Sequence, residues 1–404
     1  MMSLRPLVAG LVGVVVTVSL SHASTNSEIP AFARKHRLSC SACHNPIPTL
    51  TEFGENFAGN GFRLVAEEMP RDTIGTGDSL LELSSSLPLA FRIDAYVRAF
   101  NNGQVATDLE TPYNLKILSG GTISKNLSYY LYFFLFERGE IGGIEDAFVY
   151  VNDLGGAPVD VAIGQFQISD PLFKRELRLE FQDYAVYRAR IGLQPADLTY
   201  DRGIMAVADA GGFTITGEVV NGNGRGEAEP NRRFDNDLAK AFFGHVTRDV
   251  APNVRVGAMG YFGRQEGAFD DTSPDVTNDI WMLGADATLS FESVEINAQY
   301  IHREDDAPTF TALEEEARMN GGFVELLVRP PQSRWYALAL YNHIETNRPL
   351  LNVRLGGPAN VDKYQAFTGG FGYVLRRNFR LLVEGTWDLE QDDASWTLGL
   401  VTAF

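Results

Sequence analysis

The feature that most constrains the fold is a period-two alternation of apolar and polar side chains along most of the chain. Between 293 and 301, for example, Val294, Ile296 and Tyr300 alternate with glutamate, asparagine and glutamine. Successive side chains of a β-strand point to opposite faces, so this pattern predicts strands with one apolar and one polar face. A soluble sandwich alternates in the same way, but the aromatic residues that end many of the apolar faces favour a membrane barrel.

The spacing of the alternating segments predicts the topology. Short and long connections take turns along the chain, as in outer-membrane barrels with short periplasmic turns and long extracellular loops, and the last residue, Phe404, is the aromatic end typical of that group. We therefore expect an all-β transmembrane antiparallel barrel of about 16 strands over 76–404, in the bacterial outer membrane, with both termini periplasmic. The strands are predicted near 88–100, 111–123, 127–138, 143–152, 157–166, 203–209, 212–220, 238–248, 253–263, 279–290, 293–303, 321–329, 334–345, 363–375, 379–389 and 394–404.

Two segments depart from this simple pattern. The segment 127–136 is apolar on both faces, so Tyr130, Tyr132 and Phe134 would face the lumen. Those rings would be misplaced in a water-filled pore, whereas in a plugged barrel they could pack on the plug. The long connection 167–202 could fold into the lumen as a constriction or remain a solvated surface loop.

The first residues have the pattern of a secretory leader. Arg5 precedes an apolar run from Pro6 to Leu20, and the small residues Ser21 and Ala23 suit cleavage before residue 24. A membrane anchor is the alternative, but the run of about 15 residues is shorter than the ~20 that span a bilayer as a helix. We therefore expect a signal peptide over 1–23 and export of the rest of the chain.

The motif Cys40-Ser41-Ala42-Cys43-His44 is the attachment site of a c-type haem. In such sites both thiols bind the haem covalently, and the histidine is the proximal iron ligand. The two cysteines are the only ones in the chain, so a dithiol, a disulfide or part of a zinc site would be the alternatives. Zinc would need a second pair of ligands nearby, and a dithiol does not need the histidine. We expect one covalent haem c on Cys40 and Cys43, with His44 on the iron.

The residues around this motif predict a small helical cytochrome segment over 24–75. Thr49 and Glu52 have the spacing of a capping box. The turn that follows places Leu50, Phe53 and Phe57 on one helical face, where they are expected to pack on the haem. Because about 40 residues cannot build an adequate core alone, the segment is expected to use the haem and the barrel wall, as a plug inside the lumen.

This arrangement resembles the fused outer-membrane cytochrome–porins. The resemblance implies a monohaem cytochrome followed by a barrel, and the best-known members of that family take electrons from extracellular ferrous iron. It covers the N-terminal segment closely and the barrel only in architecture. The matching residues are Pro30, Ala31, Phe32, Ala33, Arg34, Cys40, Cys43, His44, Pro48, Leu50, Phe53, Gly54, Phe57, Gly61 and Phe62.

The second axial ligand of the iron stays open at this point. Within the segment the candidates are Met69 and His36, and methionine ligation would raise the potential. An open or water-occupied position is a further alternative. Side chains of the barrel that could reach in are His245, His302, His343 and Met259.

Charge and motif together narrow the function. The formal charge of −18 argues against a nucleic-acid partner, and the acidic residues gather in the predicted extracellular loops. The main hypothesis is an electron conduit between an extracellular donor and a periplasmic cytochrome or other carrier. Ferrous iron, Fe(II), is one candidate for the donor. The activity of the conduit would be that of an iron:cytochrome c oxidoreductase within outer-membrane lipid. The alternative is a solute porin with a tethered periplasmic cytochrome segment.

Overall fold

The computed structural model describes residues 31–64, 73–81, 83–84, 88–101, 106–168, 178–224, 233–235, 237–311, 315–353 and 356–404. The predicted leader over 1–23 and the candidate ligand Met69 lie outside these residues. Within the described residues, no helix is both long enough and apolar enough to cross a membrane.

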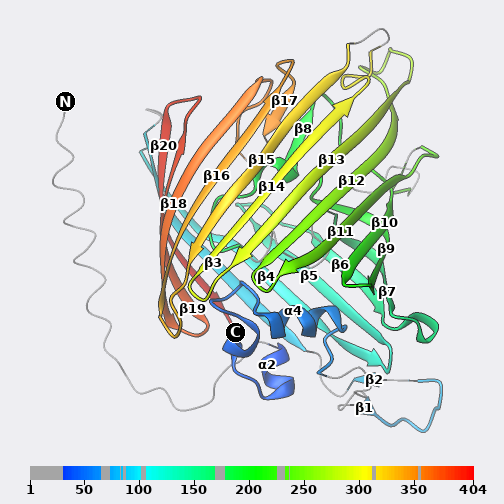
Figure 1. The fold of residues 1–404 in the computed structure, drawn as a ribbon, viewed down its shortest axis with the longest axis vertical. Helices are drawn as coiled ribbons and strands as arrows, with labels where there is room; N and C mark the ends of the chain where they lie inside the picture. Colours follow the sequence, from blue (N-terminus) through cyan, green and yellow to red (C-terminus); the bar gives the residue numbers. More distant parts are fainter. Residues whose placement is uncertain are drawn as a thin grey trace, which may run out of the picture.

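A closed antiparallel barrel forms most of the molecule (Figure 1). Its strands pair with their neighbours along the chain, and pairing of the last strand with the first closes the ring, so no edge is left unpaired. The sixteen strands in the described residues confirm the predicted count and approximate positions. They are β3 (Leu89–Phe100), β4 (Thr107–Ser124), β5 (Leu127–Glu137), β6 (Ile144–Val151), β7 (Val159–Gln167), β9 (Tyr200–Ala210), β10 (Phe213–Val220), β11 (Ala241–Ala251), β12 (Val254–Gly267), β13 (Val276–Ser290), β14 (Val294–Asp305), β15 (Ala317–Val328), β16 (Trp335–Thr346), β18 (Lys363–Arg376), β19 (Phe379–Asp388) and β20 (Asp393–Ala403).

The two faces of the barrel wall have opposite chemistry. In β19, Val383 and Trp387 are exposed on the outside, whereas Arg380 and Glu384 are buried on the inside. Contiguous exposed apolar surface of this kind is unfavourable in water and suits contact with lipid. Exposed apolar side chains of other strands include Ile163, Ile204, Val219, Phe242, Val246, Phe262, Leu283, Val324, Phe367, Phe371 and Leu398.

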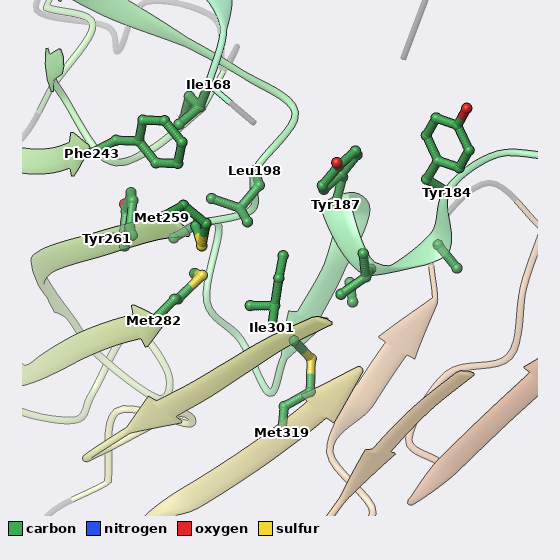
Figure 2. Packing of buried hydrophobic residues seen from close by; sticks show 14 of the residues in the cluster. Ile168, Tyr184, Tyr187, Leu198, Phe243, Met259, Tyr261, Met282, Ile301 and Met319 are labelled. Carbon is green, nitrogen blue, oxygen red and sulfur yellow. The ribbon is translucent and has the colours of Figure 1, made fainter. Parts of the chain in front are cut away.

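The connection between β7 and β9 folds into the lumen. We name its described part, 178–199, the inner segment; it contains α5 (Ala185–Arg188) and β8 (Ala189–Ile191). β8 pairs with β17 (Leu351–Val353), which belongs to another long loop. Figure 2 shows the side chains of Tyr187 and Leu198 beside those of Met259, Ile301 and Met319 from the barrel wall. The sequence left open whether this connection enters the lumen or remains a solvated surface loop, and in the structure it enters the lumen.

The N-terminal helices lie at one end of the barrel, beside the C-terminus and the short turns (Figure 1). They are α2 (Ala31–His36), α3 (Cys40–Cys43) and α4 (Glu52–Gly59). We expected this segment to fill the lumen, but it covers the mouth, and the inner segment lies within the barrel. The remaining elements are the small pair β1 (Thr73–Ile74) and β2 (Leu83–Ser84) and the turn η1 (Leu154–Gly156).

Candidate haem site at the mouth of the barrel

The candidate haem-attachment motif folds as a single helical turn. Ser39 caps α3, since its hydroxyl accepts a hydrogen bond from the Ser41 amide, and the His44 amide donates to the Cys40 carbonyl at 2.9 Å. One turn of helix brings residues three and four apart onto the same face. Cys40, Cys43 and His44 therefore present their side chains to the same side of the segment.

A hydrogen bond orients the His44 ring. Its Nδ1 lies 2.8 Å from the carbonyl oxygen of Pro48, which can only accept. With the proton on Nδ1, the other ring nitrogen, Nε2, keeps the lone pair that a metal needs. Burial lowers the pKa of His44 below its ordinary value, which favours the neutral, ligating form of the ring.

The start of α4 differs from the predicted capping box. The N-cap is Thr51 rather than Thr49: the Thr51 hydroxyl accepts from the Gly54 amide at 3.2 Å and donates to the Ala42 carbonyl at 2.8 Å. One threonine thus caps α4 and ties it to the haem motif. Gly54 allows this contact, because a Cβ there would lie 2.3 Å from the carbonyl oxygen of Cys43.

A cluster of aromatic rings links the segment to the barrel. The Phe32 ring stacks on Phe62 at 4.9 Å and meets the Phe57 ring edge-on at 5.3 Å. Phe62 in turn stacks on Tyr130 of β5 at 5.4 Å. The prediction that Tyr130 and its neighbours face inward, where another part of the chain packs on them, is therefore confirmed at this end of the barrel.

These walls enclose an apolar cavity between the segment and the barrel. Its empty volume is about 1380 Å³, counting the part that is open to solvent. The segment contributes Phe32, His36, Cys40, Cys43, His44, Leu50 and Phe57 to its lining, and the barrel contributes Ala90, Arg92, Leu118, Tyr130, Tyr132 and Ala403.

The donor set fits a c-type haem. Cys40 and Cys43 are not joined to each other, both line the cavity, and His44 lies beside them. Burial raises the pKa of both thiols, which disfavours a reactive thiolate pair. Among the described residues, no group of three or more histidine, cysteine or acidic side chains is arranged to bind a metal ion by itself.

The other predicted site residues divide into two groups. Leu50 and Phe57 line the cavity, as expected for haem packing. Phe53, by contrast, is 44% exposed and lies outside the cavity lining, so the structure corrects its assignment. We predicted that Leu50, Phe53 and Phe57 share one helical face. The helix α4 starts only at Glu52, after Leu50, and turns Phe53 towards solvent.

The candidate ligands from the barrel do not reach the cavity. His245 pairs with Asp286 at 2.8 Å, and Met259 is buried in the hydrophobic core inside the barrel. His302 contacts Asn320, and His343 contacts Gln365. The candidate that does line the cavity is His36, from α2.

Polar contacts that the sequence did not suggest anchor the segment to the short turns. The Arg63 guanidinium donates to the Lys125 carbonyl at 2.9 Å and lies 3.6 Å from the Asp153 carboxylate. The side-chain amide of Asn152 donates to the Gly59 carbonyl at 3.3 Å. Arg63 is only 2% exposed. In the sequence, Arg63 directly follows Gly61 and Phe62. No local pattern distinguishes this arginine from a surface residue.

The inner segment is held by a second set of hydrogen bonds, inside the barrel. The amides of Phe181 and Gln182 donate to the Glu384 carboxylate at 2.8 and 3.0 Å. Tyr184 donates to Glu325, and the Ala185 amide donates to the Asn342 side chain at 2.9 Å. The segment is thus fixed to three different strands of the wall rather than free to swing in the lumen.

Comparisons with known proteins agree with the barrel. No family model matches the chain, and no curated protein matches it. The fold is similar to an anion-selective porin from Comamonas acidovorans, with 13% identity and a TM-score of 0.56 over 79% of this chain and 99% of that one. It is also similar to the outer-membrane channel DcaP of Acinetobacter baumannii, with 12% identity and a TM-score of 0.53 over 79% of this chain and 97% of that one. Salmonella typhi OmpF is similar as well, with 11% identity and a TM-score of 0.54 over 79% of this chain and 97% of that one. At this identity the likeness defines the fold: a porin-type barrel.

Covalent attachment can be tested directly at the two cysteines. The purified, fully denatured protein should keep its haem, seen by haem staining after denaturing electrophoresis, because thioether bonds survive unfolding. The Cys40→Ala/Cys43→Ala double variant should lose the stain, whereas Ser41→Ala, between the two cysteines, should keep it. A double variant that retains haem after denaturation would contradict the assignment.

Docking of the segment can be tested at two nearby glycines. Gly61 has a φ of +63°, and a Cβ there would lie 2.1 Å from the Asn152 side chain. Gly61→Ala should therefore cost at least about 1 kcal/mol of docking free energy from the left-handed backbone alone. Limited proteolysis of the segment should become faster. Gly59→Ala is the control, because a Cβ at Gly59 meets nothing within 4 Å; equal rates in both variants would count against the docked position.

Proposed function

We propose that this protein is an outer-membrane electron-transfer protein with one covalent haem c. The haem would be held by Cys40, Cys43 and His44 and would pass electrons between an extracellular donor and a periplasmic carrier. When bound, the haem supplies reversible one-electron oxidation and reduction of its iron. The observation that carries the proposal is the cavity that the attachment motif and the mouth of the barrel form together.

The outer surface of the barrel supports the outer-membrane location. Its exposed apolar side chains would contact lipid, and its fold is that of bacterial outer-membrane porins. In such barrels the short turns face the periplasm. The haem site would then lie on the periplasmic side, where a soluble carrier can approach it. The cavity is lined from two sides, so its walls would also shield the edge of a bound haem.

The donor has to reach this site from the other side of the membrane. The apolar band of such a barrel is about 25 Å tall, which favours a small donor that can enter the lumen. Carboxylates such as Asp270, Asp271 and Asp275 are exposed in the loop between β12 and β13, and the chain carries a formal charge of −18. This electrostatic balance attracts cations. Ferrous iron, the donor implied by the family resemblance, is a small cation of this kind.

A solute porin with a tethered cytochrome segment is the second candidate. The similarity to porins and to an outer-membrane channel favours it over the conduit. The position of the segment at the mouth, rather than deep in the lumen, also agrees with it. The inner segment argues for the conduit, since its rings pack on the far wall: Tyr184 stacks on Phe323 at 4.1 Å.

Transfer across a membrane tests the conduit. The protein is reconstituted into vesicles that enclose an oxidised soluble cytochrome c, and ferrous iron is added outside under anaerobic conditions. The trapped cytochrome should become reduced, as followed at the haem absorption bands. Vesicles with the Cys40→Ala/Cys43→Ala barrel are the matched control, because they keep the lumen and lose the haem. Equal reduction in both preparations would overturn the conduit.

Conductance in planar bilayers tests the second candidate, the solute porin. The amide of Ile168 donates to the Thr199 carbonyl at 3.0 Å, so the two ends of the connection between β7 and β9 are close together. Replacing 169–198 by a tight two-residue turn should therefore preserve the barrel and raise its conductance several-fold. Deletion of 31–64 should raise it less, because the inner segment stays in place. An intact protein that already conducts like a general porin, unchanged by either deletion, would favour the porin function.

A further inference from the structure

We propose that His36 is the second protein ligand of the haem iron, which would make the site a bis-histidine centre. The inference rests on the proposed haem site and names a ligand that the sequence left open. It follows from the lining of the cavity, from the way α2 is held, and from the engagement of the other candidate side chains elsewhere.

The first argument is the inventory of iron ligands in the cavity wall. Histidine and methionine are the usual axial ligands of c-type haems. Among the described residues that line the cavity, the side chains of these two types are His44 and His36, and no methionine is present. The two cysteines are taken up by the thioether bonds. A second imidazole therefore lies in the wall of the same cavity as the proximal one.

The second argument is the position of α2. Phe32 and His36 are four residues apart and share one face of this helix. Both rings pack on Phe57, at 5.3 Å in each case, and the His36 ring meets it edge-on at 83°. The same aromatic cluster that docks the segment on the barrel thus holds His36 towards the cavity.

The end of α2 brings His36 and the attachment motif together. The helix ends at His36, and Arg37 takes a left-handed conformation with a φ of +55°. The Leu38 amide returns to the Ala33 carbonyl at 3.1 Å. The chain therefore reverses directly after His36 and enters α3 at Cys40, so that both arms of this turn border the cavity.

The third argument concerns the competing side chains. His245 is engaged with Asp286, and Met259 lies in the core inside the barrel. Neither lines the cavity. Met69 lies outside the described residues, and its participation is an outcome of the test below. Two imidazole ligands also predict a lower haem potential than a histidine–methionine pair.

The test compares ligand variants of the full-length, haem-loaded protein by absorption and electron paramagnetic resonance. The ferric wild type should be low-spin and should lack the charge-transfer band of a methionine–iron bond. His36→Leu keeps an apolar side chain against Phe57 and should convert the ferric haem to high-spin. Added imidazole should then restore the low-spin spectrum by occupying the vacated position. His36→Met should keep a low-spin haem with a raised midpoint potential.

Two controls make the result decisive. Arg37→Gly, at the exposed neighbouring position with positive φ, and Met69→Leu should both keep the wild-type spectrum. A low-spin, wild-type spectrum in His36→Leu would overturn the assignment, and loss of that spectrum in Met69→Leu would give the position to Met69. These readouts do not require electron transfer across a membrane. A wild type that fails to reduce trapped cytochrome but shows the expected spectra would refute the conduit alone.

Discussion

The candidate haem site depends on the contact between Phe62 and Tyr130. The helical segment has too few residues to form a core by itself, and the ring of Tyr130, on the inner face of the barrel, completes the aromatic cluster that Phe32 and Phe57 begin. Arg63 and Asn152 then fix the same segment to the short turns. The cavity exists only because both parts contribute a wall, so the barrel is part of the candidate haem site and not merely its anchor.

Two segments of the chain occupy different parts of the barrel. The N-terminal helices cover one mouth, while the inner segment crosses the interior and hydrogen-bonds to Glu325, Asn342 and Glu384 of the wall. Buried carboxylates of this kind are costly unless they are paired or hydrogen-bonded, which makes the interior arrangement specific. The barrel thus combines a porin-type wall with an interior that is narrower than the wall alone would leave.

The barrel could be predicted from the sequence because its signal is local and repeated. Alternation within each strand, such as Phe379 and Val383 against Arg380 and Glu384, is set by the pleat and does not depend on distant residues. The attachment motif is local as well. The depth of the helical segment could not be predicted in this way, since it depends on contacts such as Arg63 with Lys125, which are 62 residues apart. The capping error at Thr49 had a smaller cause: a second threonine, Thr51, lies two residues further on and caps the helix instead.

The position of the haem site constrains how a conduit of this design can work. A single haem in the middle of the lumen would have to serve both sides at a distance, whereas a haem at the short-turn mouth, on the proposed periplasmic side, would lie within reach of a periplasmic carrier and would leave the rest of the path to the donor. In the proposed conduit, the donor would have to be small enough to enter the barrel, which a small cation is and a mineral surface or a protein donor is not. The space that the inner segment leaves inside the barrel would therefore limit the size of the donor in the proposed conduit. Tyr184 and Tyr187 hold that segment against Phe323, so in the proposed conduit they would affect access of the donor although neither lines the candidate haem cavity.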